Sequence, residues 1–512
     1  MTTPAVMVLG CTSDAGKSWL ATALCRWYRR QGIKVAPFKA QNMSNHARVV
    51  RLNGAPSERS SAHTMGEMGS AQYFQALAAG IEPDVRMNPI LLKPEADTRS
   101  QVVVQGRVDL ELTQMEWRER SQHLWTIAQR AYKELAAEHD LIVIEGAGSP
   151  AEINLAQNDY VNTQTALLAQ AKCLLVSDID RGGAFAHLYG THAFMDARVR
   201  AQVAGFVLNR FRGDASLLAP GPQQLQQLTG IPTVAVIPLV RAHKLPEEDA
   251  VPTSAQPIFA RPSGSVKNAV PISSNNQATP HVVIITPPHV SNLDEFAALQ
   301  RSGVAVSFTR DPALLLAADW VVLPGSKQTR ADLAWLRAHG FAEALGRYVA
   351  QGKPLLAICG GMQLLGEQLD DPMGIEGSTA GTDVGLGLLP LITRFGTHKQ
   401  LTQTQAKFSI LTGIYSPLSG IALKGYEIHC GQTQWRGGDD KVALINTTHS
   451  EPVGWQRDNI LGLYVHGVLE QPEIIHRLFN VTPLSLEPVF EHLADVIEQS
   501  FQAGVLRELG GL

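Results

Sequence analysis

The stretch VMVLGCTSDAGKSWLATALCRWYRR, residues 6–30, decides the fold of the first half of the chain. It runs from a short apolar segment through a glycine-rich loop, residues 10–18, into a segment whose apolar residues recur with helical spacing. A strand, a glycine-rich turn and a helix in that order direct backbone N–H groups and a helix N-terminus at one point, which suits a phosphate. We therefore expect a phosphate-binding loop between a buried strand and a helix.

The residue types within this loop favour a nucleotide. Lys17 is expected to reach the β- and γ-phosphates, and the Ser18 hydroxyl is expected to hold Mg²⁺. Gly10, Ser13 and Gly16 are the further nucleotide-binding residues that we predict. The loop has one residue more between its glycines than the strict Walker A pattern. A glycine turn with an incidental lysine is the alternative, but the flanking strand and helix favour the phosphate site.

Apolar runs of strand length alternate with helical stretches over residues 1–250. The runs are VMVLG, IKVAPF, LIVIEG, CLLVSDID, VAGFVLN and TVAVIP. Nearly continuous apolar strands separated by helices are typical of a parallel sheet that is covered on both faces. The fold class that we predict for this domain is therefore α/β, with a parallel sheet that carries the phosphate loop.

Three polar residues follow or end later strands of this domain. Lys39 follows IKVAPF, Glu145 ends the run LIVIE, and Asn209 ends VAGFVLN. Because open α/β sheets bind ligands at the carboxyl ends of their strands, all three are candidates for the ATP site. Glu145 is expected to reach Mg²⁺ as a carboxylate ligand. Asn209 could contact an adenine edge, although a strand-terminal Asn is as often a turn residue.

The composition changes after the first domain. Residues 251–280 are rich in Pro, Ser, Asn and Gln and contain few large apolar residues, so we predict an interdomain linker. A second alternation follows in HVVIITP, VAVSF, DWVVLPG, PLLAICGG and ILGLYVHG. Residues 281–512 are therefore expected to form a second α/β domain.

A candidate nucleophile, Cys359, lies in PLLAICGGMQLLG between an apolar strand and an expected helix. This pattern is the sequence form of a nucleophile elbow, in which small neighbours permit a strained turn and the helix N-terminus favours the thiolate. A buried structural cysteine is the alternative. Backbone N–H groups at Gly325 and Gly361 are our candidates for stabilising an oxyanion.

Such a cysteine needs a base that is distant in sequence and near in space. His466 ends the strand-like run LGLYVHG and is our candidate. His429, in GYEIHCG, is the rival, because no single one of the 16 histidines is compelling by residue type.

The bulk composition excludes several classes of protein. A net charge of -4 gives no indication of a nucleic-acid or membrane-surface partner, and no apolar run approaches the ~20 residues of a membrane span. Five scattered cysteines without a CxxC pair argue against a disulfide framework and against a structural zinc site. Since the N-terminal segment lacks the basic residues of a signal peptide, a cytoplasmic location is expected.

Taken together, the motifs resemble those of a known family, the cobyric acid synthases of the corrinoid pathway. The resemblance covers nearly the whole chain and rests on GCTSDAGKS, PFKAQNMSN, MNPILLKP, VIEGAGSPAEINL, DIDRGG, NRFRGD, LPGSKQT, AICGGMQLLG, GYEIHCG and YVHG in that order. It implies an ATP-dependent amide ligase domain similar to dethiobiotin synthetase, followed by a domain similar to class I glutaminases. It further implies that the b, d, e and g carboxylates of a corrinoid, adenosylcobyrinic acid a,c-diamide, receive ammonia from glutamine with ATP and Mg²⁺.

Residue roles follow from the same resemblance. Lys39 would serve the transferring phosphate, and Cys359 and His466 would be the glutaminase pair. Class I glutaminases usually carry an acid two residues after the base, where this chain has Val468, so the resemblance implies a Cys–His dyad. Two further departures are YVNTQTA in place of a sequence like IVNMGMA, and Cys11 where Thr is common.

Two alternative functions remain open at this level. One is the cobyrinic acid a,c-diamide synthase, which has both domain types. The other is an ATPase switch similar to ParA and MinD, which binds partners and makes no product. FKAQNMSN and the two-domain layout favour the cobyric acid synthases over the first, and the Cys–His pair argues against the second.

Overall fold

The computed structural model describes residues 3–52, 64–96, 99–240, 245–246, 280–376, 379–438 and 441–512. These residues form two compact units. The first unit contains the described residues up to 246 together with Ser485–Leu512, and the second contains the described residues from 280 to 484. Residues 251–279 of the predicted linker lie outside the described residues.

The first unit is built on a six-stranded sheet of strand order β12-β11-β10-β1-β9-β2, in which all neighbouring strands are parallel. Its strands are β1 (Ala5–Gly10), β2 (Val35–Phe38), β9 (Leu141–Glu145), β10 (Lys172–Asp178), β11 (Val203–Phe211) and β12 (Thr233–Pro238). Each of the six apolar runs coincides with most of one of these strands, so the predicted parallel sheet is confirmed. Since all six strands run the same way, the loops after β1, β2 and β9 leave from one edge of the sheet.

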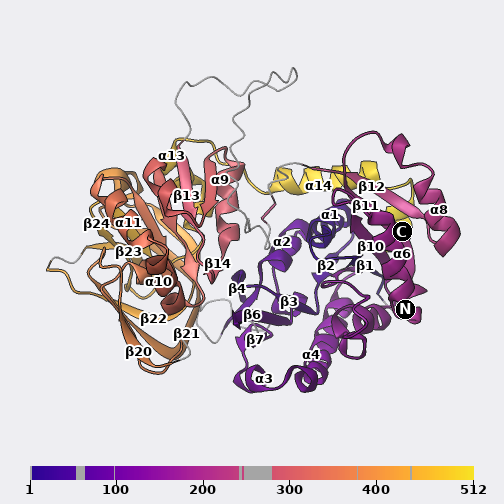
Figure 1. Ribbon diagram of the computed structural model, residues 1–512, viewed down its shortest axis with the longest axis horizontal. Coiled ribbons are helices and arrows are strands. Elements are labelled where there is room, and N and C mark those ends of the chain that lie inside the picture. The colour runs from indigo at the N-terminus through magenta and orange to yellow at the C-terminus, as the bar shows by residue number, and fades with distance from the viewer. Residues whose placement is uncertain are drawn as a thin grey trace. The chain divides into compact units, whose positions relative to one another are not determined.

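Helices cover both faces of this sheet (Figure 1). Successive residues of a strand point to opposite faces, so Val6 and Val8 join the core of α1 while Met7 and Leu9 join the core of α4 and α6. The helices of this part of the chain are α1 (Lys17–Arg30), α2 (Ser70–Ala79), α3 (Leu110–Gln114), α4 (Trp117–Glu138), α5 (Thr165–Ala169), α6 (Ala184–Phe194), α7 (Ala197–Arg200) and α8 (Gly221–Thr229).

Shorter elements complete the first unit. A four-stranded sheet joins β3 (Gln41–Met43), β6 (Ile90–Ala96), β7 (Arg99–Val104) and β8 (Arg107–Val108), and a separate pair joins β4 (Ala47–Arg51) and β5 (Met65–Gly69). Single helical turns are η1 (Val85–Met87), η2 (Ala156–Asn158) and η4 (Ala215–Leu218), and η3 (Tyr160–Gln164) is a π-helix.

The last two helices, α14 (Glu487–Ser500) and α15 (Val505–Gly510), belong to the first unit. Phe490, Leu493 and Ile497 of α14 are buried in the same core as residues of α1. The two helices lie side by side (Figure 1). The Tyr28 hydroxyl of α1 donates to the backbone oxygen of Leu506 at 2.8 Å. The sequence-based boundary assigned residues 281–512 to the second domain, whereas this apolar packing places Ser485–Leu512 with the first.

The second unit is a mixed α/β structure, as predicted. Its eleven-stranded sheet has the order β15-β13-β16-β18-β25-β24-β23-β21-β19-β20, with β22 paired to β21, and the run from β15 to β25 is parallel. The strands are β13 (His281–Ile285), β15 (Ala305–Thr309), β16 (Trp320–Leu323), β18 (Leu355–Ile358), β19 (Gln368–Asp371), β20 (Gly381–Val384), β21 (Leu391–Phe408), β22 (Ala422–Trp435), β23 (Val442–Asn446), β24 (Pro452–Arg457) and β25 (Ile460–Leu463).

Helices and a two-stranded ribbon surround this sheet. The ribbon pairs β14 (Val290–Ser291) with β17 (Gly325–Ser326). The helices are α9 (Ala297–Arg301), α10 (Thr329–Ala338), α11 (Phe341–Ala350), α12 (Gly360–Leu364) and α13 (Pro472–Phe479), with shorter turns η5 (Leu293–Phe296), η6 (Pro312–Ala317), η7 (Gly413–Leu418) and η8 (Val468–Glu470). Within the described part of the chain, every helix is too short or too polar to serve as a membrane span.

Candidate active sites

The glycine-rich loop joins β1 directly to α1, in the arrangement that the sequence predicted. Gly16 precedes α1 with a φ of 94°, a left-handed conformation that favours glycine. A Cβ atom on Gly16 would lie 2.0 Å from Nδ2 of Asn209, and one on Gly10 would lie 2.8 Å from Nζ of Lys17. The loop therefore needs both glycines to pack closely against polar side chains.

Lys17 lies at the start of α1 and is almost completely buried. Its Nζ donates to the backbone oxygen of Thr12 at 3.0 Å and to that of Gly148 at 3.1 Å. Gly148 belongs to the loop that follows β9, so the ammonium group lies between the two loops. Neutral carbonyl groups hold this charge, and a phosphate oxygen would bind it more strongly.

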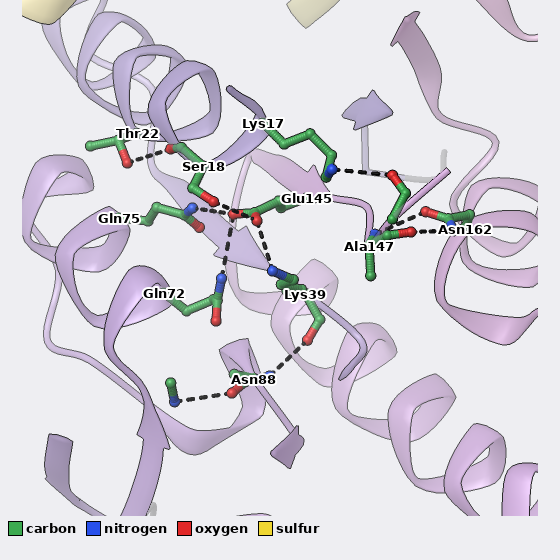
Figure 2. Close-up of polar contacts among 12 residues, drawn as sticks. Lys17, Ser18, Thr22, Lys39, Gln72, Gln75, Asn88, Glu145, Ala147 and Asn162 are labelled. Atoms are coloured by element: carbon green, nitrogen blue, oxygen red, sulfur yellow. Dashed lines mark hydrogen bonds and ion pairs between the residues drawn. The ribbon is translucent and has the colours of Figure 1, made fainter. Parts of the chain in front are cut away.

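Glu145, the last residue of β9, is the centre of a buried polar cluster (Figure 2). Its Oε1 accepts hydrogen bonds from Ser18 Oγ and from Lys39 Nζ, each at 2.8 Å. Its Oε2 accepts from Gln75 Nε2 at 2.6 Å and from Gln72 Nε2 at 3.4 Å. The structure thus brings together three residues that the sequence singled out, Ser18, Lys39 and Glu145, and adds two glutamines from α2.

This cluster keeps Glu145 ionised. Burial alone would raise the pKa of its carboxyl group, but the Lys39 charge and the hydrogen bonds from Lys39, Gln75 and Ser18 outweigh burial and lower the pKa below its ordinary value. A permanent carboxylate beside a hydroxyl is a pair of hard oxygen donors of the kind that Mg²⁺ takes, together with phosphate oxygens and water. Ser18 and Glu145 therefore fit a Mg²⁺–nucleotide complex.

Asn209 lies within β11, and its side chain supports the glycine-rich loop. Its Nδ2 donates to the backbone oxygen of Ala15 at 2.9 Å, and its Oδ1 accepts from the backbone N–H of Arg210. These hydrogen bonds explain the asparagine at this position without a ligand. A contact of Asn209 with adenine stays a prediction. Ser13 is exposed at the loop tip, where its hydroxyl is accessible.

Sequence reasoning missed Asn162, which lies in the YVNTQTA segment. Its side-chain amide both donates to the backbone oxygen of Ala147 at 2.8 Å and accepts from the N–H of Ala147 at 3.0 Å (Figure 2). The π-helix η3 carries Asn162 and is capped by Asp159, which accepts from the N–H groups of Asn162 and Thr163. The segment thus holds the loop after Glu145, the loop whose Gly148 accepts from Lys17.

In the second unit, Cys359 lies between β18 and α12 in a strained backbone conformation. Its φ is 51° and its ψ is -111°, which is unusual for a residue with a side chain. The N–H of Cys359 donates to the backbone oxygen of Leu463 at 2.7 Å, and its thiol donates to that of Ile428 at 3.5 Å. This is the geometry of the predicted nucleophile elbow.

The two predicted oxyanion glycines lie close to this elbow, because Gly361 packs against the backbone of Leu323 and Pro324, which directly precede Gly325. Gly361 is in the first turn of α12, where backbone N–H groups have no acceptor within the helix. A Cβ atom on Gly361 would lie only 2.1 Å from the backbone oxygen of Leu323, so no side chain fits there. Gly325 is in β17, and a Cβ atom on it would lie 2.9 Å from Cε1 of His466.

His466 is fully enclosed, and a carboxylate orients it. Its Nδ1 is 3.1 Å from Oε1 of Glu295, and Oε2 of the same residue accepts from the N–H of Gly467 at 2.8 Å. Burial lowers the pKa of His466, but the Glu295 charge and the hydrogen bond with Cys359 raise it more, to about 10. The charged form of His466 is therefore favoured, and Glu295 is the acid that it contacts.

Glu295 is the second functional residue that sequence reasoning missed. The absent acid at Val468 led us to expect a Cys–His pair with an unidentified orienting group. The structure supplies the acid from η5, more than a hundred residues before the base. The segment LDEF that contains it matches no motif, and only its approach to His466 reveals the contact.

The rival base, His429, has different partners. Its Nδ1 is 2.8 Å from the backbone oxygen of Gly431, its Nε2 is 3.2 Å from Oε2 of Glu427, and its ring stacks on Tyr464. These contacts hold the imidazole against β22. The described residues contain no group of three or more His, Cys, Asp or Glu residues arranged as a metal site.

Comparison with known proteins assigns a family to each half. Residues 6–252 match the CobQ/CobB/MinD/ParA nucleotide binding domain, and residues 281–474 match the CobB/CobQ-like glutamine amidotransferase domain. A cobyric acid synthase of Leptothrix cholodnii is 54% identical over 511 residues, which cover 99% of this chain and 96% of that protein. The cobyric acid synthases of a Polaromonas species and of Methylibium petroleiphilum are 52% and 53% identical, over 98% and 99% of this chain and 98% and 96% of their own lengths.

Proposed function

The chain belongs to the cobyric acid synthase family and is a glutamine-dependent amide ligase, and from that premise we propose how its residues divide the work. The first unit activates a carboxylate with ATP, and the second releases ammonia from glutamine. The observation that carries this proposal is the buried contact of His466 with Glu295, in the unit that holds Cys359 in its strained turn, in a chain that also has a phosphate loop.

In the first unit, an oxygen of the acceptor carboxylate attacks the γ-phosphorus of ATP, the bond to the β-phosphate oxygen breaks, and ADP leaves. The product is an acyl phosphate, which ammonia can attack because phosphate is a good leaving group. Lys17 and Lys39 balance the charge that spreads over the phosphate oxygens. Mg²⁺ held by Ser18 and Glu145 would supply further positive charge at the β- and γ-phosphates.

In the second unit, the Cys359 sulfur attacks the side-chain amide carbon of glutamine. The oxyanion that forms accepts hydrogen bonds from N–H groups near Gly361 and Gly325, and His466 gives its proton to the departing ammonia. Water then attacks the glutamyl thioester, His466 takes the proton from that water, and glutamate leaves. Glu295 holds the imidazole ring in place and stabilises its charged form throughout.

The acceptor that we propose is the corrinoid of the sequence analysis, adenosylcobyrinic acid a,c-diamide, amidated at carboxylates b, d, e and g. The ATPase-switch alternative leaves the amidotransferase match over residues 281–474 without a role. A cytoplasmic location stays a prediction from the sequence.

Mass spectrometry of the product tests this function. The protein is incubated with Mg²⁺, ATP, glutamine labelled with ¹⁵N at the side-chain amide, and either cobyrinic acid or its a,c-diamide. We expect the diamide to gain successive labelled amide groups, one for each carboxylate converted, with one glutamate released for each. Amidation of cobyrinic acid alone, stopping at the diamide, would assign the chain to the a,c-diamide synthase reaction instead.

A further inference from the structure

Both oxygens of the Glu145 carboxylate are occupied by side-chain donors (Figure 2). Ser18 and Lys39 donate to Oε1, and Gln75 and Gln72 donate to Oε2. Glu145 is only 1% exposed. Because a carboxylate offers roughly four lone-pair positions, these four donors leave none for another ligand. A cation can therefore bind Glu145 only if a donor leaves.

The two glutamines are not the donors that leave readily. Gln72 and Gln75 are fully buried on α2, and their amide oxygens have no hydrogen-bond partner among the described residues. A buried amide oxygen without a partner costs free energy, so the fold accepts this cost twice to keep both amide nitrogens turned toward Glu145. Gln72 and Gln75 are thus positioning residues that hold Oε2 of Glu145. A donor can therefore be replaced only at Oε1.

We infer that Lys39 is a resident counter-ion of Glu145, which trades places with the divalent cation when the nucleotide binds. The inference rests on the proposed role of Ser18 and Glu145 as the Mg²⁺ residues. Ser18 Oγ and Lys39 Nζ share the same oxygen, each at 2.8 Å, so a cation between Ser18 and Glu145 lies beside the Lys39 ammonium group. Two positive charges so close in a buried site repel each other strongly, and Lys39 has to move.

The phosphates of the nucleotide give Lys39 a new partner at the moment that it leaves. Without them, a divalent cation would have to displace a buried ammonium group that gains no anion in return. Lys39 thereby couples metal binding to nucleotide binding. Lys17 differs from Lys39 in that it donates to the backbone oxygens of Thr12 and Gly148.

Electron paramagnetic resonance of Mn²⁺, as a substitute for Mg²⁺, tests the exchange without an activity assay. Wild-type protein should bind Mn²⁺ weakly alone and tightly with ADP. Lys39→Met should bind Mn²⁺ alone at least about tenfold more tightly than wild type, since the competing charge is gone. Lys39→Arg should bind Mn²⁺ as weakly as wild type, because it keeps that charge. Lys133→Met, at an exposed position of α4, is the control and should leave the binding of Mn²⁺ alone unchanged.

Thermal unfolding gives a second measurement on the same variants. Lys39→Met leaves a buried carboxylate without its charge partner, so its Tm should fall, and Mn²⁺ alone should restore it while leaving the wild-type Tm unchanged. Tight binding of Mn²⁺ by nucleotide-free wild type, or no gain in Lys39→Met, would overturn the exchange. Should Lys39→Met not fold even with Mn²⁺, the wild-type and Lys39→Arg titrations decide. Absence of Mn²⁺ binding by wild type even with ADP would instead refute the proposed metal residues themselves.

Discussion

The phosphate loop and the nucleophile elbow both turn a parallel strand into a helix, but they place the unusual backbone in different residues. In the loop, Asp14 and Gly16 have positive φ, and the reactive side chains of Lys17 and Ser18 follow in ordinary helical conformations. In the elbow, Cys359 itself has the positive φ. The loop binds with its backbone, so a glycine brings that backbone close to a ligand. The elbow reacts through a side chain, so the strain falls on the residue that must project.

The comparison predicts first that the two sites can be separated at Cys359. Cys359→Ser should lose glutamine-dependent amide synthesis by about 10⁴-fold or more, because a serine hydroxyl lacks the nucleophilicity of a thiolate at neutral pH. Synthesis driven by a high concentration of ammonium salt should persist, since carboxylate activation uses the other unit. Both rates are measured by product formation at saturating ATP.

His466→Ala should give the same division between glutamine and ammonium salt, whereas His429→Ala should retain use of glutamine. Loss of both activities in Cys359→Ser would contradict the separation of the two sites.

The second prediction concerns the phosphate loop, where a substitution should affect both nitrogen sources and not glutamine alone. Lys17→Ala should lower synthesis from glutamine and from ammonium salt alike, by about 10²- to 10³-fold, because both routes need the activated carboxylate. Glutamine hydrolysis, measured separately as glutamate release, should continue. Near-normal synthesis from ammonium salt would refute the assignment of the phosphate loop.

A third prediction tests Glu295. In wild type, the pKa of His466 is raised from 6.5 to about 10, so the imidazolium persists until the pH rises through that value. Glu295→Gln removes the largest contribution that raises this pKa, and the alkaline limit of glutamine hydrolysis should therefore move to lower pH, with kcat/KM at pH 8 reduced by about 10²-fold.

The matched control for this change is Glu427→Gln, which alters the acid beside the rival histidine, His429. Its pH profile should keep the wild-type alkaline limit. An unchanged profile in Glu295→Gln would mean that another group orients His466.

A fourth prediction concerns the close packing of the elbow. Gly361→Ala should destabilise the second unit by about 1–3 kcal/mol, because the new methyl group would lie 2.1 Å from a rigid backbone oxygen. Gly346→Ala, in α11 with nothing within 4 Å of the added atom, is the control and should not destabilise it. Calorimetry of the intact chain measures both, and equal unfolding temperatures would contradict the close packing.

The smallest expected effect is at Val468. Val468→Glu restores the acid of class I glutaminases in sequence but should raise glutamine hydrolysis less than about twofold, because Glu295 already contacts His466. Val468 is buried, so the new carboxylate would also lack a prepared partner. A large gain in kcat would show that Glu295 is a poor substitute for the missing acid.

Sequence patterns were sufficient where chemistry depends on residues close to one another along the chain. The phosphate loop and Cys359 at an elbow were each predicted from a strand, a turn and a helix in order, and Glu145 was predicted from its place at the end of a strand. The carboxyl ends of parallel strands also meet at one edge, which is why Lys39 and Glu145 could be expected near each other.

The sequence could not predict contacts made by elements without a motif. Glu295 lies in a single turn of helix, and whether it faces His466 depends on how that turn packs. Gln72 and Gln75 look like ordinary polar residues of a helix, yet both are fully buried against Glu145. Asn209 shows the reverse difficulty, because a residue that suggested ligand contact makes hydrogen bonds that hold the loop.

Because α14 and α15 belong to the first unit, that unit cannot complete its fold until synthesis of the chain has ended. On the ribosome, these helices emerge only after the whole glutaminase unit, so the apolar side of α1 that they cover stays bare while more than two hundred further residues are made. During that interval the first unit exposes apolar surface. We expect this incompletely folded unit to aggregate before the second unit at high temperature or at high protein concentration. Deletion of α14 and α15 should for the same reason destabilise the first unit, although that unit is translated first.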